Sequence, residues 1–142
     1  MKSYLDILIR RSLVSLVLLA FFAVSLASAD GWSRFRGPNG TGDGGDLAFP
    51  AKWDDDDYLW SRDLPGRGHS SPVGWKDRIF VTCGDQETGA TTLLSLSADT
   101  GEEIWRETFA GAPHRIHGGN SYASTTPAID AQRIYLTYFG PE

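Results

Sequence analysis

The stretch SSPVGWKDRIFVT, residues 70–82, recurs 55 residues further along the chain as TTPAIDAQRIYLT, residues 125–137. Each copy begins with two hydroxyl side chains and a proline, and each ends in an Arg-Ile-aromatic run. Two short apolar runs separated by polar turn residues are typical of a β-hairpin, and neither copy has the period of a helix. The sequence therefore predicts two copies of one β-structured unit.

A second element repeats at a shorter interval. The stretch LWSRDL, residues 59–64, resembles IWRETF, residues 104–109, so that Trp60 and Trp105 stand 45 residues apart. Repeats of about 40–50 residues with about four strands each are typical of a β-propeller, whose blades must pack on one another. The sequence thus predicts an all-β fold, namely a partial β-propeller of four-stranded antiparallel blades.

The prediction amounts to about one and a half blades. One complete blade is expected over residues 70–109, with strands at 70–75, 78–83, 92–97 and 102–108. The next blade starts at Thr125 and has two strands. Residues 57–64 are expected to form a Trp-bearing outer strand with no strands of its own blade before it.

Four residues are expected to be structural marks of the repeat: Trp60, Thr100, Gly101 and Trp105. The Asp99-Thr100-Gly101 stretch is interpreted as a hairpin turn, in which the Asp99 carboxylate caps the turn and Gly101 takes a positive φ. Trp105 lies on the strand after this turn, where a large aromatic side chain can cover the gap between two blades.

The N-terminal residues have the pattern of a secretory signal peptide. Lys2, Arg10 and Arg11 precede the apolar run 13–26, and Ala-Ser-Ala at 27–29 is a small-residue cleavage site. A membrane anchor is the alternative, but this run is shorter than the roughly 20 residues that a spanning helix needs. The arginine pair leaves twin-arginine export open beside the ordinary route.

The chain is accordingly divided into a signal peptide helix at 1–29, a Gly/Pro/Asp-rich loop segment at 30–56, and propeller repeats at 57–142. Cleavage after Ala29 predicts an exported protein, periplasmic or extracellular, with no stable membrane span. Of its 142 residues, 13 are basic and 18 acidic, a net charge of -5, and this excludes the basic surface that a nucleic-acid partner requires.

One segment resembles the repeat of a known protein family. The stretch LSLSADTGEEIW, residues 94–105, resembles the repeat of the PQQ-like, quinoprotein-type β-propeller family, which has two hydrophobic strand residues, Ala-x-x-Thr-Gly and an outer-strand Trp. WSRFRGPNG, residues 32–40, is similar to an opening segment of secreted bacterial members. The resemblance implies a propeller whose face holds a protein partner or a small ligand.

Two functions follow from this resemblance. The first is a binding or assembly scaffold, and the alternative is a pyrroloquinoline quinone (PQQ)-dependent alcohol or sugar dehydrogenase with PQQ and calcium as cofactors. Quinoprotein dehydrogenases carry a disulfide between adjacent cysteines beside the cofactor. With Cys83 as its single cysteine, this chain cannot form that disulfide, and we therefore expect a scaffold.

Candidate functional residues lie in the loops that lead from an outer strand to the next inner strand. In a propeller these loops open on one face, and they hold Arg67, His69, His114, Arg115, His117 and Asn120. Such side chains can form a ligand- or partner-facing rim, or they can be solvated loop residues. The three histidines could also bind zinc in an open site, although no metal site is assigned.

The remaining chemistry-bearing residues have plainer interpretations. Asp54 to Asp57 is read as a solvated acidic loop, since the run lacks the EF-hand spacing that would favour calcium. Asn39, Asp43 and Asp46 give a similar weak calcium signal. Cys83 is expected to be a small buried hydrophobe rather than a nucleophile, because no pattern supplies a base.

Length bears on the same interpretation. Removal of residues 1–29 leaves 113 residues, whereas a closed ring of four to eight blades needs roughly 160–400 residues. We therefore interpret the sequence as the N-terminal part of a larger propeller. A small protein that assembles blades between chains is the other interpretation.

Overall fold

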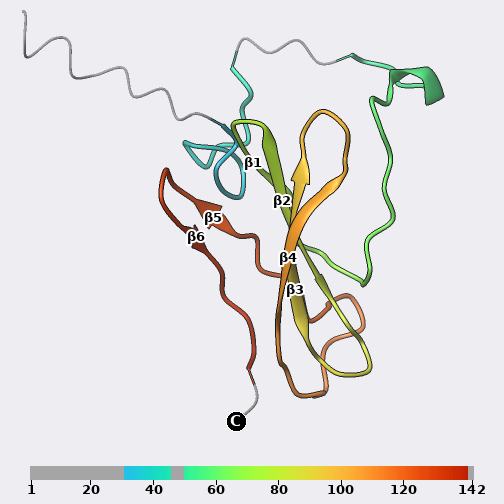
Figure 1. The fold of residues 1–142 in the computed structure, drawn as a ribbon, viewed down its shortest axis with the longest axis vertical. Coiled ribbons are helices and arrows are strands. Elements are labelled where there is room, and N and C mark those ends of the chain that lie inside the picture. Colours follow the sequence, from blue (N-terminus) through green and yellow to red (C-terminus); the bar gives the residue numbers. More distant parts are fainter. Residues whose placement is uncertain (1–30, 46–49, 141–142) are drawn as a thin grey trace, which may run out of the picture.

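The computed structural model describes residues 31–45 and 50–140, and the predicted signal peptide helix lies outside these residues. The fold is mostly sheet, as the sequence predicted, and the described part holds a single short 3-10 turn, Asp55–Asp57. Its six strands are β1 (Val73–Trp75), β2 (Arg78–Gly84), β3 (Thr91–Ser97), β4 (Glu103–Phe109), β5 (Ala128–Ile129) and β6 (Ile134–Tyr135) (Figure 1). None of the helical structure described is long and apolar enough to cross a membrane.

Strands β1 to β4 form one antiparallel sheet in chain order, and β5 and β6 form a separate two-stranded sheet. The predicted strand positions of the complete unit are confirmed, with β1 shorter than expected and the other boundaries shifted by about one residue. The register pairs Val81 with Leu94 and Thr82 with Leu93. Short turns join the strands, so each strand pairs with its neighbour in the sequence.

Residues 57–64 were expected to form an outer strand, and this prediction is wrong, because the structure has no strand there. No strand of the described part pairs with the backbone of this segment, so the segment joins no ladder. Side chains attach the segment instead. The Trp60 indole N–H donates to the Ala98 carbonyl oxygen at 2.8 Å, and Arg62 donates to the Gly101 carbonyl oxygen at 3.3 Å.

One face of the four-stranded sheet is covered by this segment. Val81 and Cys83 of β2 and Leu94 and Leu96 of β3 form a buried cluster, and Trp60 packs against it together with Ile79. The alternation of side chains across the strands places these residues on the same side. The tryptophan therefore gives one apolar face its cover without adding a strand.

The opposite face is covered by the β5–β6 hairpin. Val73, Phe80 and Leu93 form its buried cluster, against which Trp105 of β4 and Ile129 and Ile134 of the hairpin pack, as the cluster's partners. The rings of Phe80 and Trp105 lie 6.0 Å apart, centroid to centroid. Trp105 thus lies between the sheet and the second repeat.

A β-bulge between Ser95 and Leu96 of β3 interrupts the pairing with β4. Ser95 pairs with Trp105 and Leu96 pairs with Glu103, so Ile104 is the extra residue. Residues three apart in a regular strand point to opposite faces. The bulge instead places Glu103 and Arg106 on the same side, where their side chains form two hydrogen bonds of 2.6 Å.

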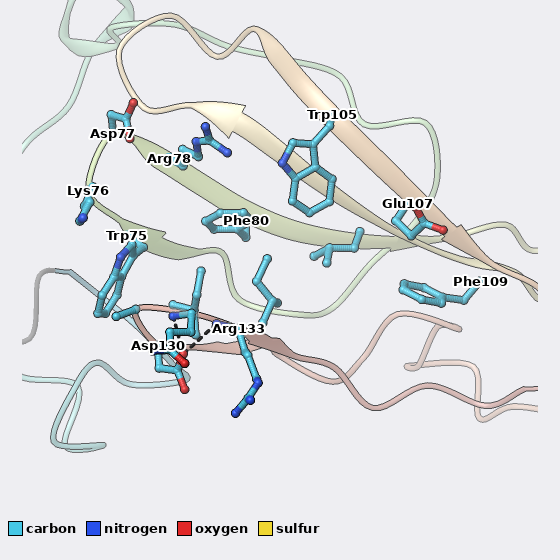
Figure 2. Close-up of a pocket in the computed structure, with 15 residues that line it drawn as sticks. Trp75, Lys76, Asp77, Arg78, Phe80, Trp105, Glu107, Phe109, Asp130 and Arg133 are labelled. Carbon is cyan, nitrogen blue, oxygen red and sulfur yellow. Dashed lines mark hydrogen bonds between the residues drawn. The ribbon is translucent and has the colours of Figure 1, made fainter.

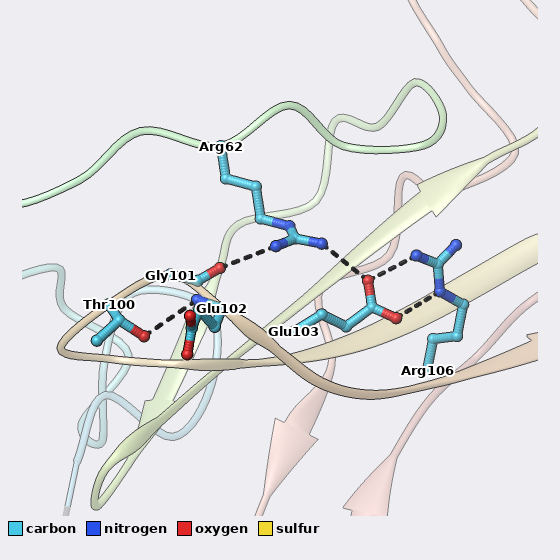
Figure 3. Close-up of polar contacts among 6 residues, drawn as sticks. All are labelled: Arg62, Thr100, Gly101, Glu102, Glu103 and Arg106. Atoms are coloured by element: carbon cyan, nitrogen blue, oxygen red, sulfur yellow. Dashed lines mark hydrogen bonds and ion pairs between the residues drawn. The ribbon is translucent and has the colours of Figure 1, made fainter.

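Glu103 also accepts a hydrogen bond from Arg62 at 2.9 Å, so two guanidinium groups hold one carboxylate (Figure 3). The hydrogen bonds from Arg106, followed by the charges of Arg106 and Arg62, lower the pKa of Glu103. This Arg62–Glu103–Arg106 clamp ties the covering segment to β4. Because the clamp is solvent-exposed, it adds little to the stability of the fold and mainly orients the covering segment on β4.

The turn between β3 and β4 follows the prediction in its backbone but not in its cap. Gly101 has the predicted positive φ, 69°. The capping role expected of Asp99 is taken by hydroxyls: Ser97 Oγ accepts from the Thr100 N–H and Thr100 Oγ1 accepts from the Glu102 N–H. Each hydroxyl binds an N–H two or three residues further along the chain, a local spacing at which Ser and Thr side chains commonly bond the backbone.

Replacing Gly101 by Ala should destabilise the fold strongly. A Cβ at this position would lie 2.4 Å from the Trp60 ring, and the residue would be left in a conformation that favours glycine. We expect a loss of about 2–4 kcal/mol in the free energy of unfolding, measured by chemical denaturation. Gly118→Ala is the matched control, since no atom lies within 4 Å of its added Cβ. Equal losses in the two variants would show that Trp60 does not lie on this turn.

Replacing Glu103 by Gln should reduce the acid sensitivity of the fold. A carboxylate whose folded pKa is lowered stabilises the fold above its ordinary value of 4.5, and this contribution disappears as the pH falls through the lowered pKa. Between about pH 6 and pH 2, the wild type should therefore lose more stability than Glu103→Gln. Glu102→Gln, one residue away and outside the clamp, should retain the wild-type slope.

Candidate functional site

The two loops that the sequence singled out lie against each other at one end of the sheet. The backbone N–H groups of His69 and Ser70 both donate to the Ala123 carbonyl oxygen, at 3.0 and 3.1 Å. Arg67 exchanges two backbone hydrogen bonds with Gly84 at the end of β2, at 3.0 and 2.8 Å. Residues 66–70 and 111–125 therefore form one composite rim, although they are far apart in the sequence.

The two repeats also meet at equivalent positions. The Ser71 N–H donates to Thr126 Oγ1 at 2.9 Å, and these two residues are 55 positions apart, the interval of the repeat. The N-terminal segment joins the same strands from the other side. Trp32 O accepts from the Gly74 N–H of β1 at 3.0 Å, and Ser33 O accepts from the Ile129 N–H of β5 at 2.8 Å. The first strands of both repeats are thereby held side by side.

His114 is the predicted rim residue with the most contacts. Its backbone N–H donates to the Tyr122 hydroxyl at 3.0 Å, and that hydroxyl donates to the His114 carbonyl oxygen at 2.7 Å. The imidazole lies edge-on to the rings of Tyr122 and Phe139, at 5.1 and 5.3 Å between centroids. A small cavity of about 50 Å³ lies here, and Asn120 also lines it.

The other predicted rim residues stay apart from this cavity. His117 Nδ1 accepts from the Gly119 N–H at 3.2 Å, which is a local turn contact. Arg67, His69 and Arg115 have exposed side chains. Within residues 31–45 and 50–140, no three His, Cys, Asp or Glu side chains come close enough together to bind a metal ion. The structure thus joins the loops but does not bring their three histidines together.

Calcium binds through several oxygen ligands, usually including carboxylates. The described residues bring no such group together, so they do not fit the calcium site that the family resemblance implies. Asp54 and Asp57 instead cap their own turn, in which Asp54 Oδ1 accepts from the Asp56 N–H and Asp57 Oδ2 accepts from the Asp54 N–H.

The remaining weak candidates also serve local structure. Asn39 Oδ1 accepts from the backbone and the hydroxyl of Thr41, and Asp43 Oδ1 accepts from the Gly45 N–H. Asp46 lies outside the described residues. Cys83 is buried, as expected, and burial raises the pKa of its thiol against the opposing effects of the Arg106 charge and the Gly66 N–H. A thiol of this kind is a poor nucleophile.

A groove of about 670 Å³ lies between the four-stranded sheet and the β5–β6 hairpin. Figure 2 shows Phe80 and Trp105 directed from the sheet toward the hairpin, with Phe109 and Glu107 further along β4. The wall nearest the β1–β2 turn carries charged side chains, among them Arg78 and Asp130. The groove therefore has an aromatic floor along β4 and a charged end.

Sequence reasoning missed this groove. Arg78–Gly84 and Thr91–Ser97 contain consecutive apolar residues. Because successive side chains of a strand point to opposite faces, these runs indicated that both faces of the sheet are apolar. The sequence could not predict how much of one face the second hairpin leaves uncovered, because that depends on how residues distant in the sequence dock. Tyr122 was missed for the same reason, since its hydroxyl bonds with His114 eight residues away.

No family model, curated protein or solved structure matches this chain. The function is therefore argued from its own residues.

Tyr122→Phe should loosen the 111–125 loop without unfolding the sheet. The substitution removes one acceptor and one donor that hold the His114 backbone, contacts worth about 1 kcal/mol each. We expect faster amide hydrogen exchange at His114 and its neighbours, with unchanged exchange in β2 and β3. Tyr58→Phe, at an exposed tyrosine, is the control. Unchanged exchange at His114 would mean that the hydroxyl does not order the loop.

Proposed function

We propose that this chain is an exported repeat protein of the PQQ-like β-propeller type, which acts as a binding or assembly scaffold rather than as a dehydrogenase. The observation that carries the proposal is the contact between equivalent residues of the two repeats, Ser71 and Thr126. In a β-propeller the first strands of neighbouring blades lie side by side around a common axis, so this contact supports the proposal.

The way the faces stack supports the same proposal. Ile134 and Leu136 of the second repeat correspond, at the 55-residue interval, to Ile79 and Val81 of the first. Ile79 and Val81 lie on the face that Trp60 covers. Ile134 and Leu136 instead pack against the Val73, Phe80 and Leu93 cluster, on which Trp105 also packs. Trp60 therefore lies on one face of the first unit, and Trp105 lies on the equivalent face of the second. Successive units are thus related head to tail.

The scaffold interpretation draws on the chemistry of the rim. The two loops from successive repeats meet at Ala123 and present exposed arginine and histidine side chains. These side chains belong to connecting loops on a rigid sheet, where binding residues commonly lie. The described residues bring together no metal-binding group, and the single cysteine is buried. A surface for a protein partner or a small ligand is the use that these features favour.

Site-specific photo-crosslinking tests the rim. A photoreactive amino acid placed at Arg115, in the full chain in its native host, should give a discrete covalent adduct with a protein partner. The same amino acid at Asp99, in the turn at the far end of the sheet, is the control and should give none. Adducts at both positions or at neither would contradict a partner-binding rim.

The dehydrogenase alternative has a separate test. The full chain is supplied with PQQ and Ca²⁺, and reduction of an artificial dye is followed with alcohols and sugars as substrates. A scaffold should show no substrate-dependent reduction. Turnover that requires both PQQ and substrate would overturn the proposal in favour of the alternative.

A further inference from the structure

The N-terminal strap, residues 31–40, contains the opening stretch WSRFRGPNG and belongs to neither buried cluster of the sheet. It has a structure of its own, held by local contacts. Gly37 has a φ of 79° and lies against the Trp32 ring, which an added Cβ would approach to 2.9 Å. The Arg34 guanidinium donates to the carbonyl oxygens of Gly37 and Pro38, at 3.3 and 2.6 Å. The strap is therefore a preformed element that docks on the sheets.

The strap joins the two repeats through its backbone, and Figure 1 shows it beside β1 and β5. Two consecutive carbonyl oxygens, those of Trp32 and Ser33, accept from the N–H groups of Gly74 in β1 and Ile129 in β5, at 3.0 and 2.8 Å. Gly74 and Ile129 are 55 positions apart, so they hold equivalent places in the two repeats. One short stretch of backbone thus binds both repeats at the same position of their first strands.

The two first strands are held differently along their length. At the rim end they meet directly, since the Ser71 N–H donates to Thr126 Oγ1 at 2.9 Å. Three residues further along each strand, the N–H groups of Gly74 and Ile129 donate to the strap instead. A single contact at the rim end would leave the repeats free to hinge about it. The rim contact and the strap together fix the angle between the repeats.

The seat of the strap on β1 is tight but small. A Cβ at Gly31 would lie 2.2 Å from the Gly74 carbonyl oxygen and 3.1 Å from the Trp75 Cα, and these are backbone atoms that cannot move aside. Residues 31–33 are only half-buried. A segment attached by few buried contacts and two backbone hydrogen bonds can open locally while the rest of the fold stays intact.

We propose that the strap is a positioning device for the rim. By fixing the angle between the two repeats, it holds residues 66–70 and 111–125 in their binding arrangement. It docks and undocks as one unit, because each of its two hydrogen bonds keeps the neighbouring carbonyl group in place. Opening of the strap therefore loosens the rim while the four-stranded sheet stays folded. The inference rests on the proposed scaffold function, because the rim is the site that the strap controls.

Two variants at one position test docking as a unit. Gly74→Pro removes the N–H that the Trp32 carbonyl oxygen accepts, and this N–H faces the strap rather than β2. Gly74→Ala keeps the N–H, and the nearest atom to its added Cβ is the Arg78 carbonyl oxygen at 4.0 Å. In the full chain, amide hydrogen exchange at Ile129 should become at least about tenfold faster in Gly74→Pro and change less than about twofold in Gly74→Ala. Unchanged exchange at Ile129 in Gly74→Pro, or equal changes in both variants, would overturn the proposal.

A second variant leaves the sheet residues untouched. Gly31→Ala should eject the strap from β1 and accelerate exchange at both Gly74 and Ile129, with exchange in β2 and β3 unchanged. Gly45→Ala is its control, since Gly45 also has a positive φ, 64°, but no atom lies within 4 Å of the added Cβ. Faster exchange at Gly74 alone would contradict docking as a unit. Faster exchange throughout β2 and β3 would make the strap part of the core and overturn the proposal as well.

The rim is followed by its own amide groups. The N–H groups of His69 and Ser70, which donate to the Ala123 carbonyl oxygen, should exchange at least about threefold faster in Gly31→Ala than in Gly45→Ala. Equal exchange in the two variants would refute control of the rim by the strap. Crosslinking from Arg115 should fall in Gly31→Ala and persist in Gly45→Ala. Absence of crosslinking in the chain with Gly31 intact would refute the proposed rim function, whereas the exchange rates would still decide whether the strap positions the loops.

Discussion

A sheet with apolar side chains on both faces must be covered twice before it is stable, and this constraint organises the whole described structure. Leu94 is fully buried on one face, and Val73 is almost fully buried on the other. The strands from Arg78 to Ser97 therefore cannot form a stable unit alone. Trp60 and the β5–β6 hairpin cover these faces, and several contacts outside the sheet hold the two covers in place.

The two covers are made differently. One is a single tryptophan, Trp60, held by its indole N–H on Ala98 and by the clamp around Glu103. The other is a second copy of the β-hairpin, aligned by the contact between Ser71 and Thr126 and by the N-terminal Trp32–Ser33 backbone. The first cover shields its face of the sheet from solvent. The second is narrower than the sheet, and a groove remains over β4 as a result.

The same stacking brings the candidate rim together. When the first strands of two repeats lie side by side, the loops that precede them also become neighbours, and Ala123 then accepts hydrogen bonds from the loop of His69. The candidate rim and the groove between the sheets are thus two consequences of one arrangement.

Much of the local structure could be read from the residues. Short apolar runs bounded by turn residues located β1 to β4, and Gly101 marked the turn by its need for a positive φ. Two local errors have clear causes. Residues 57–64 carry a strand-like sequence but no strand pairs with them, and the cap expected of Asp99 is supplied instead by the hydroxyls of Ser97 and Thr100.

The sequence by itself determined the strands, the turn and the 55-residue repeat, because these depend on neighbouring residues and on the alternation of side chains. Only the tertiary structure decided that Trp60 covers a face from outside a strand, that His114 meets Tyr122 and Phe139 while the other histidines stay apart, and that a groove opens beside β6. These features depend on how segments distant along the chain dock. Docking depends on the shapes of both surfaces together, and each surface is formed by residues from more than one stretch of the sequence.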